Sequence, residues 1–217
     1  MPATNKLTMI NNLNILVQSC TMCSLGSTQP CDKSGKKYNP HVLSNLNPTR
    51  FMVVGQNPGM TEIIQSIPFI GPSGDRFNKE LAKHDLTRDE FYISNTVKCY
   101  TEGNAKPDFK HTSACEPILR MELGIVKPVM VITLGAVAFD CFCPDKSMAD
   151  NLGSIVKSTK FNIDVYPIYH PSPMNLAVKE RSDKFNEDIE TLCKLIKRYK
   201  EVKNASYYSG SIQQSGS

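Results

Sequence analysis

The stretch Arg50-Phe51-Met52-Val53-Val54-Gly55 is a short apolar run that ends in glycine. Its length and its aromatic and β-branched side chains indicate a strand buried on both faces. The loop Gln56-Asn57-Pro58-Gly59 follows at once, and its proline and glycine mark the end of the strand. A buried strand that runs into a polar, glycine-containing loop is typical of a parallel sheet in an α/β domain.

The rest of the chain alternates strands and helices around this stretch. Strands are predicted at 91–94, 129–134 and 163–169, and helices at 5–18, 75–83, 113–125 and 181–200. Pro167 places the last strand at an edge of the sheet or makes it irregular. We expect one α/β domain over residues 1–202 with a mainly parallel sheet, followed by a disordered tail over 203–217.

Composition sets the class of protein but not its function. The chain has 217 residues, of which 40% are apolar and 21% charged, and this fits one folded domain. The net charge of +4 is too small to indicate a nucleic-acid partner by itself. No apolar stretch suits a membrane span or a secretory signal, so we expect an intracellular protein without a membrane partner.

Three polar segments follow the strands: residues 55–62, 95–99 and 170–176. The carboxyl ends of parallel strands meet at one edge of a sheet, and ligands bind there. The sequence therefore predicts that these three segments form one site.

Four of the eight cysteines have a spacing that suits a metal centre. Cys20 and Cys23 form a C-x2-C pair, and Cys99 and Cys115 flank the polar loop after the second strand. Four thiolates suffice for a 4Fe–4S cluster. One alternative is a zinc site in an α/β protein that carries out unrelated small-molecule chemistry. Another is that the cysteines are simply buried in the core.

The order of the motifs resembles the uracil-DNA glycosylase superfamily in its iron–sulfur branch, family 4 and its relatives. The matching segments are Cys20 and Cys23, then 55–62, 68–74 and 94–99, then Cys115, and finally His170-Pro171-Ser172-Pro173. The resemblance implies a three-layer α/β/α fold around a four-stranded parallel sheet. It also implies that Cys20, Cys23, Cys99 and Cys115 hold a 4Fe–4S cluster.

One motif departs from the usual pattern of that branch. The branch reads Gly-Glu-Ala-Pro-Gly where this chain has Gly55-Gln56-Asn57-Pro58-Gly59. Gln56 is similar to the classical uracil-DNA glycosylases, and Asn57 is similar to the mismatch-specific uracil glycosylases. An alternative therefore stays open, in which a catalytically altered member binds DNA or processes a modified base. Covalent trapping of the sugar through His111 is a further alternative, but the basic insertion of such relatives is missing.

Excision of uracil requires that the base be flipped out of the stack, read in a pocket and released as an anion. Asn95 is the candidate reader, because a carboxamide offers a donor and an acceptor side by side that match O4 and N3–H of uracil. Phe69 is the candidate stacking face. His170 can donate to O2 in the transition state, and a neutral imidazole is sufficient for this.

The first motif supplies further candidates. Gln56 can bind the base through its backbone N–H, and Asn57 can position the attacking water. Glu62 can crowd the C5 edge of the base and exclude thymine, or it can simply be an acid at the start of a helix.

The resemblance also implies contacts to DNA. Ser73 and Ser172 can hold phosphates, and Met174 is an apolar tip that can fill the vacated stack. The expected partner is uracil-containing DNA, single- or double-stranded, and the resemblance supports a monomer.

Overall fold

The computed structural model describes residues 3–42, 44–47 and 49–212, and it describes side chains from residue 5 to residue 202 outside the two gaps. Its centre is a sheet with the strand order β2-β1-β3-β5-β4. The strands are β1 (Phe51–Gly55), β2 (Phe91–Asn95), β3 (Met130–Leu134), β4 (Val156–Ser158) and β5 (Ile163–Ile168). The first four strands of that order are parallel, and β4 pairs antiparallel with β5. The α/β class is thus confirmed.

The short strand β4 makes the sheet five-stranded, whereas the sequence analysis expected four strands. Pro167 also lies inside the sheet and not at an edge, because β5 stands between β3 and β4. The strand tolerates this proline for a local reason. Strand β4 pairs with β5 only as far as Val165, so no ladder on that side needs a backbone N–H at Pro167.

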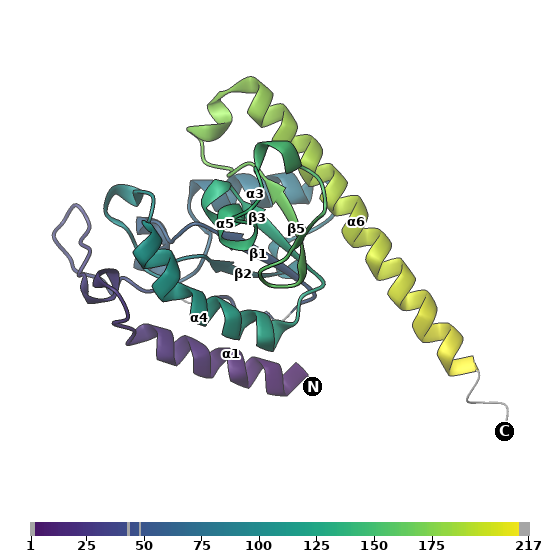
Figure 1. Ribbon diagram of the computed structural model, residues 1–217, viewed down its shortest axis with the longest axis horizontal. Coiled ribbons are helices and arrows are strands. Elements are labelled where there is room, and N and C mark those ends of the chain that lie inside the picture. Colours follow the sequence, from purple (N-terminus) through teal and green to yellow (C-terminus); the bar gives the residue numbers. More distant parts are fainter. Residues whose placement is uncertain (1–2, 43, 48, 213–217) are drawn as a thin grey trace.

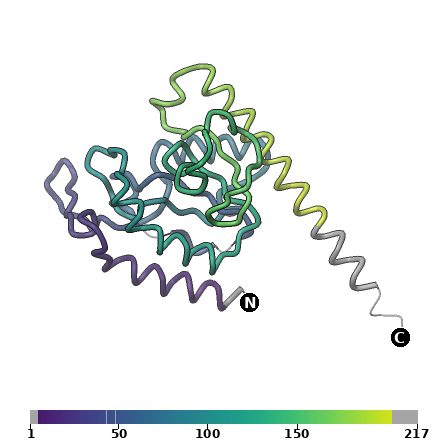
Figure 2. The backbone as a smooth tube through the Cα atoms, viewed as in Figure 1, coloured from purple at the N-terminus to yellow at the C-terminus, as the bar shows by residue number. Residues whose placement is uncertain are grey.

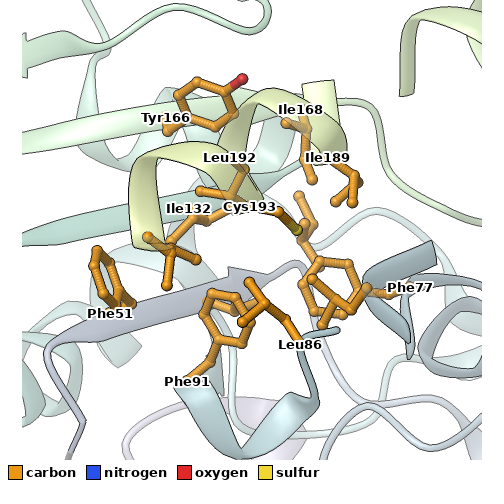
Figure 3. Packing of buried hydrophobic residues seen from close by; sticks show 14 of the residues in the cluster. Phe51, Phe77, Leu86, Phe91, Ile132, Tyr166, Ile168, Ile189, Leu192 and Cys193 are labelled. Atoms are coloured by element: carbon orange, nitrogen blue, oxygen red, sulfur yellow. The ribbon is translucent and has the colours of Figure 1, made fainter. Parts of the chain in front are cut away.

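Alternation along the strands gives the sheet two apolar faces. Phe51 and Val53 point to one face, and Met52 and Val54 to the other. Helices α3 (Pro72–Ala82) and α6 (Lys179–Ile212) cover the first face. Figure 3 shows Ile189, Leu192 and Cys193 of α6 packed over this face.

The second face is covered by three helices, so the fold has three layers (Figure 1). They are α1 (Ala3–Gln18), α4 (Phe109–Val126) and α5 (Ala136–Phe142). Helix α1 reaches the core through Ile10, Leu13 and Val17, and it lies alongside α4. Helices α1 and α6 thus pack on opposite faces of the sheet, and in Figure 2 they run along different sides of the tube.

Three helices differ from expectation. Residues 60–65 form helix α2 (Met60–Gln65), which is not among the helices expected from the sequence. Helix α3 begins at Pro72, before the expected start at residue 75, and Gly71 is at its N-cap position. Helix α6 continues to Ile212 and so passes the expected end of the domain at residue 202. The prediction of a disordered tail falls on residues whose side chains are not described, and 213–217 lie outside the described residues.

In the described part of the chain, no helix is both long and apolar enough to cross a membrane.

Candidate active site

A cavity of about 240 Å³ lies at the carboxyl ends of β1, β2 and β5. It is smaller than the pockets of roughly 300–1,000 Å³ that hold drug-sized ligands, so its volume suits a small ring. Residues from all three predicted segments line it, and so do loop residues after β2. The lining residues are Asn57–Glu62, Phe69, Gly71–Ser73, Asn95, Tyr100, Gly103, Asn104 and His170.

Asn95 ends β2 and is buried at the wall of the cavity. No hydrogen bond joins its carboxamide to another residue of the described chain, while its backbone carbonyl accepts from the Lys98 ammonium at 2.5 Å. The residue is only 6% exposed, but its carboxamide is not among the fully buried side-chain groups of the described chain that lack a partner, so its polar atoms are accessible from the cavity. The side chain is therefore free to read a ligand in the cavity.

Phe69 stands on the opposite wall in a left-handed backbone conformation with φ of 56°. Its carbonyl and that of Pro68 accept from the Arg88 guanidinium at 3.1 and 2.7 Å. Gly74 makes the close approach of this loop to α3 possible, since a Cβ there would lie 2.1 Å from the Phe69 oxygen. The aromatic ring is thus held firmly against the cavity, as a stacking face requires.

His170 follows β5, and its ring meets that of Phe69 edge to face at 6.4 Å. Burial lowers the pKa of the imidazole to about 4, and the nearby Glu62 carboxylate opposes that shift only in part. The ring is therefore neutral at physiological pH. Asn175 donates to the His170 carbonyl at 2.8 Å and fixes the turn that carries it.

Asn57 lines the cavity, and its side chain joins a network of amides. Its Oδ1 accepts from Gln56 Nε2 at 2.8 Å, and its Nδ2 lies 3.0 Å from Thr101 Oγ1 and 2.9 Å from Asn104 Oδ1. The loop after β2 therefore orients Asn57. Gln56 itself is not among the lining residues, and its side chain turns toward Asn57 and Ala105.

Glu62 is buried, and its carboxylate accepts hydrogen bonds from three backbone N–H groups. Oε2 accepts from Gly59 at 3.0 Å, while Oε1 accepts from Ile70 at 3.0 Å and from Gly71 at 2.7 Å. The side chain caps α2 and ties the first motif to the Phe69 loop. The sequence left two roles open for Glu62. These hydrogen bonds match its role as an acid at the start of a helix.

The three predicted DNA contacts lie at different places. Ser73 lines the cavity at the start of α3. Ser172 lies outside the cavity, and its hydroxyl accepts from the Asn175 N–H at 3.3 Å. Met174 is 88% exposed at the tip of its loop, which suits an apolar wedge.

A buried ion pair behind Asn95 was not foreseen. Lys98 Nζ and Glu122 Oε2 lie 2.7 Å apart with almost no exposed side-chain surface. Lys98 also donates to Ser94 Oγ at 2.7 Å, and Glu122 Oε1 accepts from Tyr92 at 2.9 Å and from Ser94 at 2.8 Å. The pair supports the end of β2. Lys98 directly precedes the predicted ligand Cys99, and no pattern in the sequence indicated that it forms a buried ion pair.

The four predicted ligand cysteines gather beyond the end of β2. Cys99 and Cys115 are buried together with Val97, and Leu25 packs against them. Burial raises the pKa of the Cys99 thiol, and the thiols of Cys115, Cys23 and Cys20 raise it further, so all four lie within electrostatic range. The Lys98 ammonium acts in the opposite direction and favours thiolates at Cys99 and Cys115.

The local backbone keeps these cysteines together. His41 Nε2 lies 2.9 Å from the Cys20 carbonyl, and residue 41 pairs antiparallel with Cys99. Within the described residues, no three His, Cys, Asp or Glu side chains converge closely enough for a single metal ion. A 4Fe–4S cluster takes one thiolate for each iron, so its four thiolates stand farther apart than those of one tetrahedral ion. The donor set fits such a cluster.

His111, considered above for covalent trapping, lies away from the cavity lining. Its Nδ1 is 3.0 Å from Asp108 Oδ1, and its Nε2 is 3.2 Å from Ser24 Oγ. Both ring nitrogens are thus engaged at the start of α4.

Comparison with known proteins agrees with this arrangement. The family model described as the Uracil DNA glycosylase superfamily matches residues 43–193. The Type-4 uracil-DNA glycosylase of Thermotoga maritima is 30% identical over 192 residues, which cover 84% of this chain and 92% of that protein. The Type-4 enzyme of Sulfurisphaera tokodaii is 28% identical over 166 residues, 72% of this chain and 71% of that protein. The Type-5 uracil-DNA glycosylase of Pyrobaculum aerophilum is 30% identical over 110 residues, 49% of this chain and 45% of that protein. With a site at the carboxyl ends of its strands and a family match over most of its length, this chain belongs to the uracil-DNA glycosylase superfamily.

Proposed function

We propose that this protein is a uracil-DNA glycosylase that removes uracil from DNA in base excision repair. The observation that carries the proposal is that one cavity is lined by an Asn95 carboxamide without a hydrogen-bond partner in the described chain and by a neutral His170 imidazole. The printed names of the Type-4 relatives support the same reaction.

Each wall of the cavity has a role in this reaction. The flipped base stacks on Phe69, and the Asn95 carboxamide donates to O4 and accepts from N3–H. Cytosine presents a donor and an acceptor in the reverse order, so it leaves both groups of Asn95 unpaired. A site built in this way rejects the wrong base because its buried polar groups lose their partners.

The bond that breaks joins C1′ of the sugar to N1 of uracil. Its electron pair goes to the uracil ring, where O2 gains negative charge, and His170 donates a hydrogen bond to that oxygen. A water held by Asn57 adds its oxygen to C1′ and releases one proton, while the uracil anion takes up one proton. One water is consumed, and the products are free uracil and an abasic sugar.

Cys20, Cys23, Cys99 and Cys115 are the residues that would hold a 4Fe–4S cluster. When bound, the cluster supplies a structural cross-link between the N-terminal segment and the loop after β2. That loop contains Thr101 and Asn104, which orient Asn57. The cluster ligands and the water-positioning residue are therefore coupled through one loop.

The partner that this site requires is DNA with an accessible uracil, in a single strand or a duplex. Ser73 and Ser172 contact phosphates, Met174 fills the vacated stack, and Gln56 binds the base through its backbone N–H. The protein acts as an intracellular monomer.

The test uses iron-loaded protein and oligonucleotides with one uracil, in single- and double-stranded form, followed by alkali. We expect strand cleavage only with uracil, and a loss of two to four orders of magnitude in rate for His170→Ala and Asn95→Ala. Asn57→Ala tests the water position in the same assay. His84→Ala, a histidine outside the cavity, is the matched control and keeps the wild-type rate.

The absence of cleavage by well-folded, iron-loaded protein would contradict the uracil assignment. It would favour the altered family member, which binds DNA or acts on a modified base.

A further inference from the structure

A basic hairpin beside the active-site mouth has no part in the reaction described above. Residues 31–37 form a tight hairpin, closed by an antiparallel bridge between Cys31 and Lys37. Its three lysines, Lys33, Lys36 and Lys37, are all exposed. Within the described chain, none of their ammonium groups forms an ion pair with a carboxylate.

The hairpin is held in one shape by its single acid. Asp32 Oδ1 accepts from the Ser34 N–H at 2.8 Å and from the Lys36 N–H at 3.1 Å, and Oδ2 accepts from the Tyr38 hydroxyl at 2.8 Å. The Ser34 hydroxyl also donates to Oδ1 at 2.6 Å, and this bond, followed by that of Tyr38 and the two backbone bonds, lowers the pKa of the Asp32 carboxyl to about 2. The carboxylate is therefore ionised, and with three lysines and one aspartate the hairpin keeps a net charge of +2. Gly35, with φ of 83°, makes the turn.

The hairpin reaches the rim of the cavity. Residues 31–34 line an open hollow together with Met60 and Ile64 of α2, and Met60 also lines the active-site cavity. In Figure 1 the hairpin projects on the same side of the molecule as the carboxyl ends of the strands. A strand whose base enters the cavity continues past its rim, so phosphates farther along the strand than those that flank the flipped nucleotide come within reach of the hairpin.

We propose that Lys33, Lys36 and Lys37 form a phosphate-binding hairpin that holds the DNA backbone on the α2 side of the flipped nucleotide. This inference rests on the proposed function, since it takes DNA as the substrate. The two sides of the mouth then differ: the exposed Met174 loop contributes an apolar tip, and the hairpin contributes three exposed lysines in a segment of net charge +2. Lysines on a rigid support attract phosphates without reading the base sequence.

The experiment compares Lys33→Gln/Lys36→Gln/Lys37→Gln with wild-type protein, both iron-loaded and full length. The control is Lys194→Gln/Lys197→Gln/Lys200→Gln on α6, which removes the same net charge away from the cavity lining. Binding to a 30-base-pair duplex without uracil is measured against salt concentration. Each lost contact lowers the slope of log Kd against log salt by about 0.9, so we expect a decrease of about 2 to 3 and at least tenfold weaker binding in low salt. The control keeps the wild-type slope within 1.

A second readout uses the length of the substrate. With a 30-nucleotide uracil substrate, kcat/KM of the hairpin variant falls at least fivefold, mainly through KM. With a trinucleotide that has uracil in the middle, the ratio of variant to wild type stays near one, because so short a strand has no phosphate at the hairpin.

An unchanged slope and affinity in the hairpin variant would overturn the proposal, and so would an equal loss in the α6 control. An acidic protein as the true partner would give that unchanged result with DNA. Failure of the wild-type protein to excise uracil would contradict the proposed function only, because the binding experiment needs no uracil.

Discussion

Gly55 leaves the space that the Asn95 side chain occupies: a Cβ on Gly55 would lie 2.6 Å from Asn95 Oδ1. The two residues are paired across the parallel strands β1 and β2. A methyl group at position 55 must therefore push the carboxamide out of its place. We expect Gly55→Ala to lower kcat/KM for uracil by about 10- to 1,000-fold, the range for a misplaced transition-state contact.

The matched control for that substitution is Gly124→Ala in α4. A Cβ at Gly124 meets nothing within 4 Å, and alanine favours the helix by about 0.5–1 kcal/mol over glycine. This variant should be slightly more stable and equally active. Similar rates for the two variants would show that the space at Gly55 does not position the reader.

The buried His170 ring makes stability depend on pH. An unfolded histidine has a pKa of about 6.5, whereas burial lowers that of His170 to about 4. Between these values the unfolded protein binds more protons, so the free energy of unfolding falls as the pH drops from about 6.5 toward 4. We expect Tm to fall more between pH 7.5 and 5.0 in wild-type protein than in His170→Asn. The comparison removes the contribution of other acids, and equal losses of Tm would contradict a lowered pKa.

The ion pair behind the reader should contribute to stability and to base recognition. Lys98→Met leaves the Glu122 carboxylate buried without its cation, and such a break costs about 3–5 kcal/mol. It also removes the donor to the Asn95 carbonyl. Chemical denaturation measures the first effect, and the kcat for uracil measures the second.

Two further variants give this test its control. Lys194→Met breaks an exposed pair with Glu190 and should cost less than about 1 kcal/mol. Lys98→Met/Glu122→Gln should recover part of the loss, because no buried charge is left alone. A cost below 1 kcal/mol for Lys98→Met would show that the buried pair is dispensable.

Local sequence patterns predicted the parallel strands well because each is a short apolar run bounded by turn residues. Strand β1 was expected at 50–55 and spans Phe51–Gly55. The edge strand β4 has three residues of mixed polarity, and helix α2 has only six residues. Elements this short carry no clear period, and tertiary pairing decides them.

The candidate site could likewise be predicted from the sequence only in part. Position after a strand was enough to bring Asn57, Asn95 and His170 to one cavity. The partners of each side chain could not be foreseen, because they come from distant segments. Glu62 binds the amides of residues 70 and 71, and Lys98 pairs with Glu122, which is 24 positions away.

The cysteines separate into two groups that a single assay can distinguish. If the proposed cluster is present, Cys99→Ser and Cys115→Ser should lose iron and the visible absorbance of an iron–sulfur cluster, because each removes one of its four proposed ligands. Cys143→Ser and Cys193→Ser change equally buried thiols in the two apolar cores and should keep their iron. Iron content per chain and visible absorbance measure the difference. Equal iron in all four variants would contradict the ligand assignment.

Glu62 allows its two proposed roles to be separated by one conservative change. In Glu62→Gln the amide NH2 replaces one acceptor oxygen, so it faces a backbone donor at Gly59 or donors at Ile70 and Gly71. An unsatisfied buried donor costs about 1–3 kcal/mol. If the carboxylate mainly ties the loops together, the variant loses stability and uracil excision, and it still does not act on thymine.

A role in excluding thymine would give a different result. The variant would then begin to release thymine from a T·G mismatch while its stability stayed near that of the wild type. Thermal unfolding and base release from matched uracil and thymine duplexes measure both quantities. Because three backbone donors already occupy the carboxylate, we expect the loss of stability and no release of thymine.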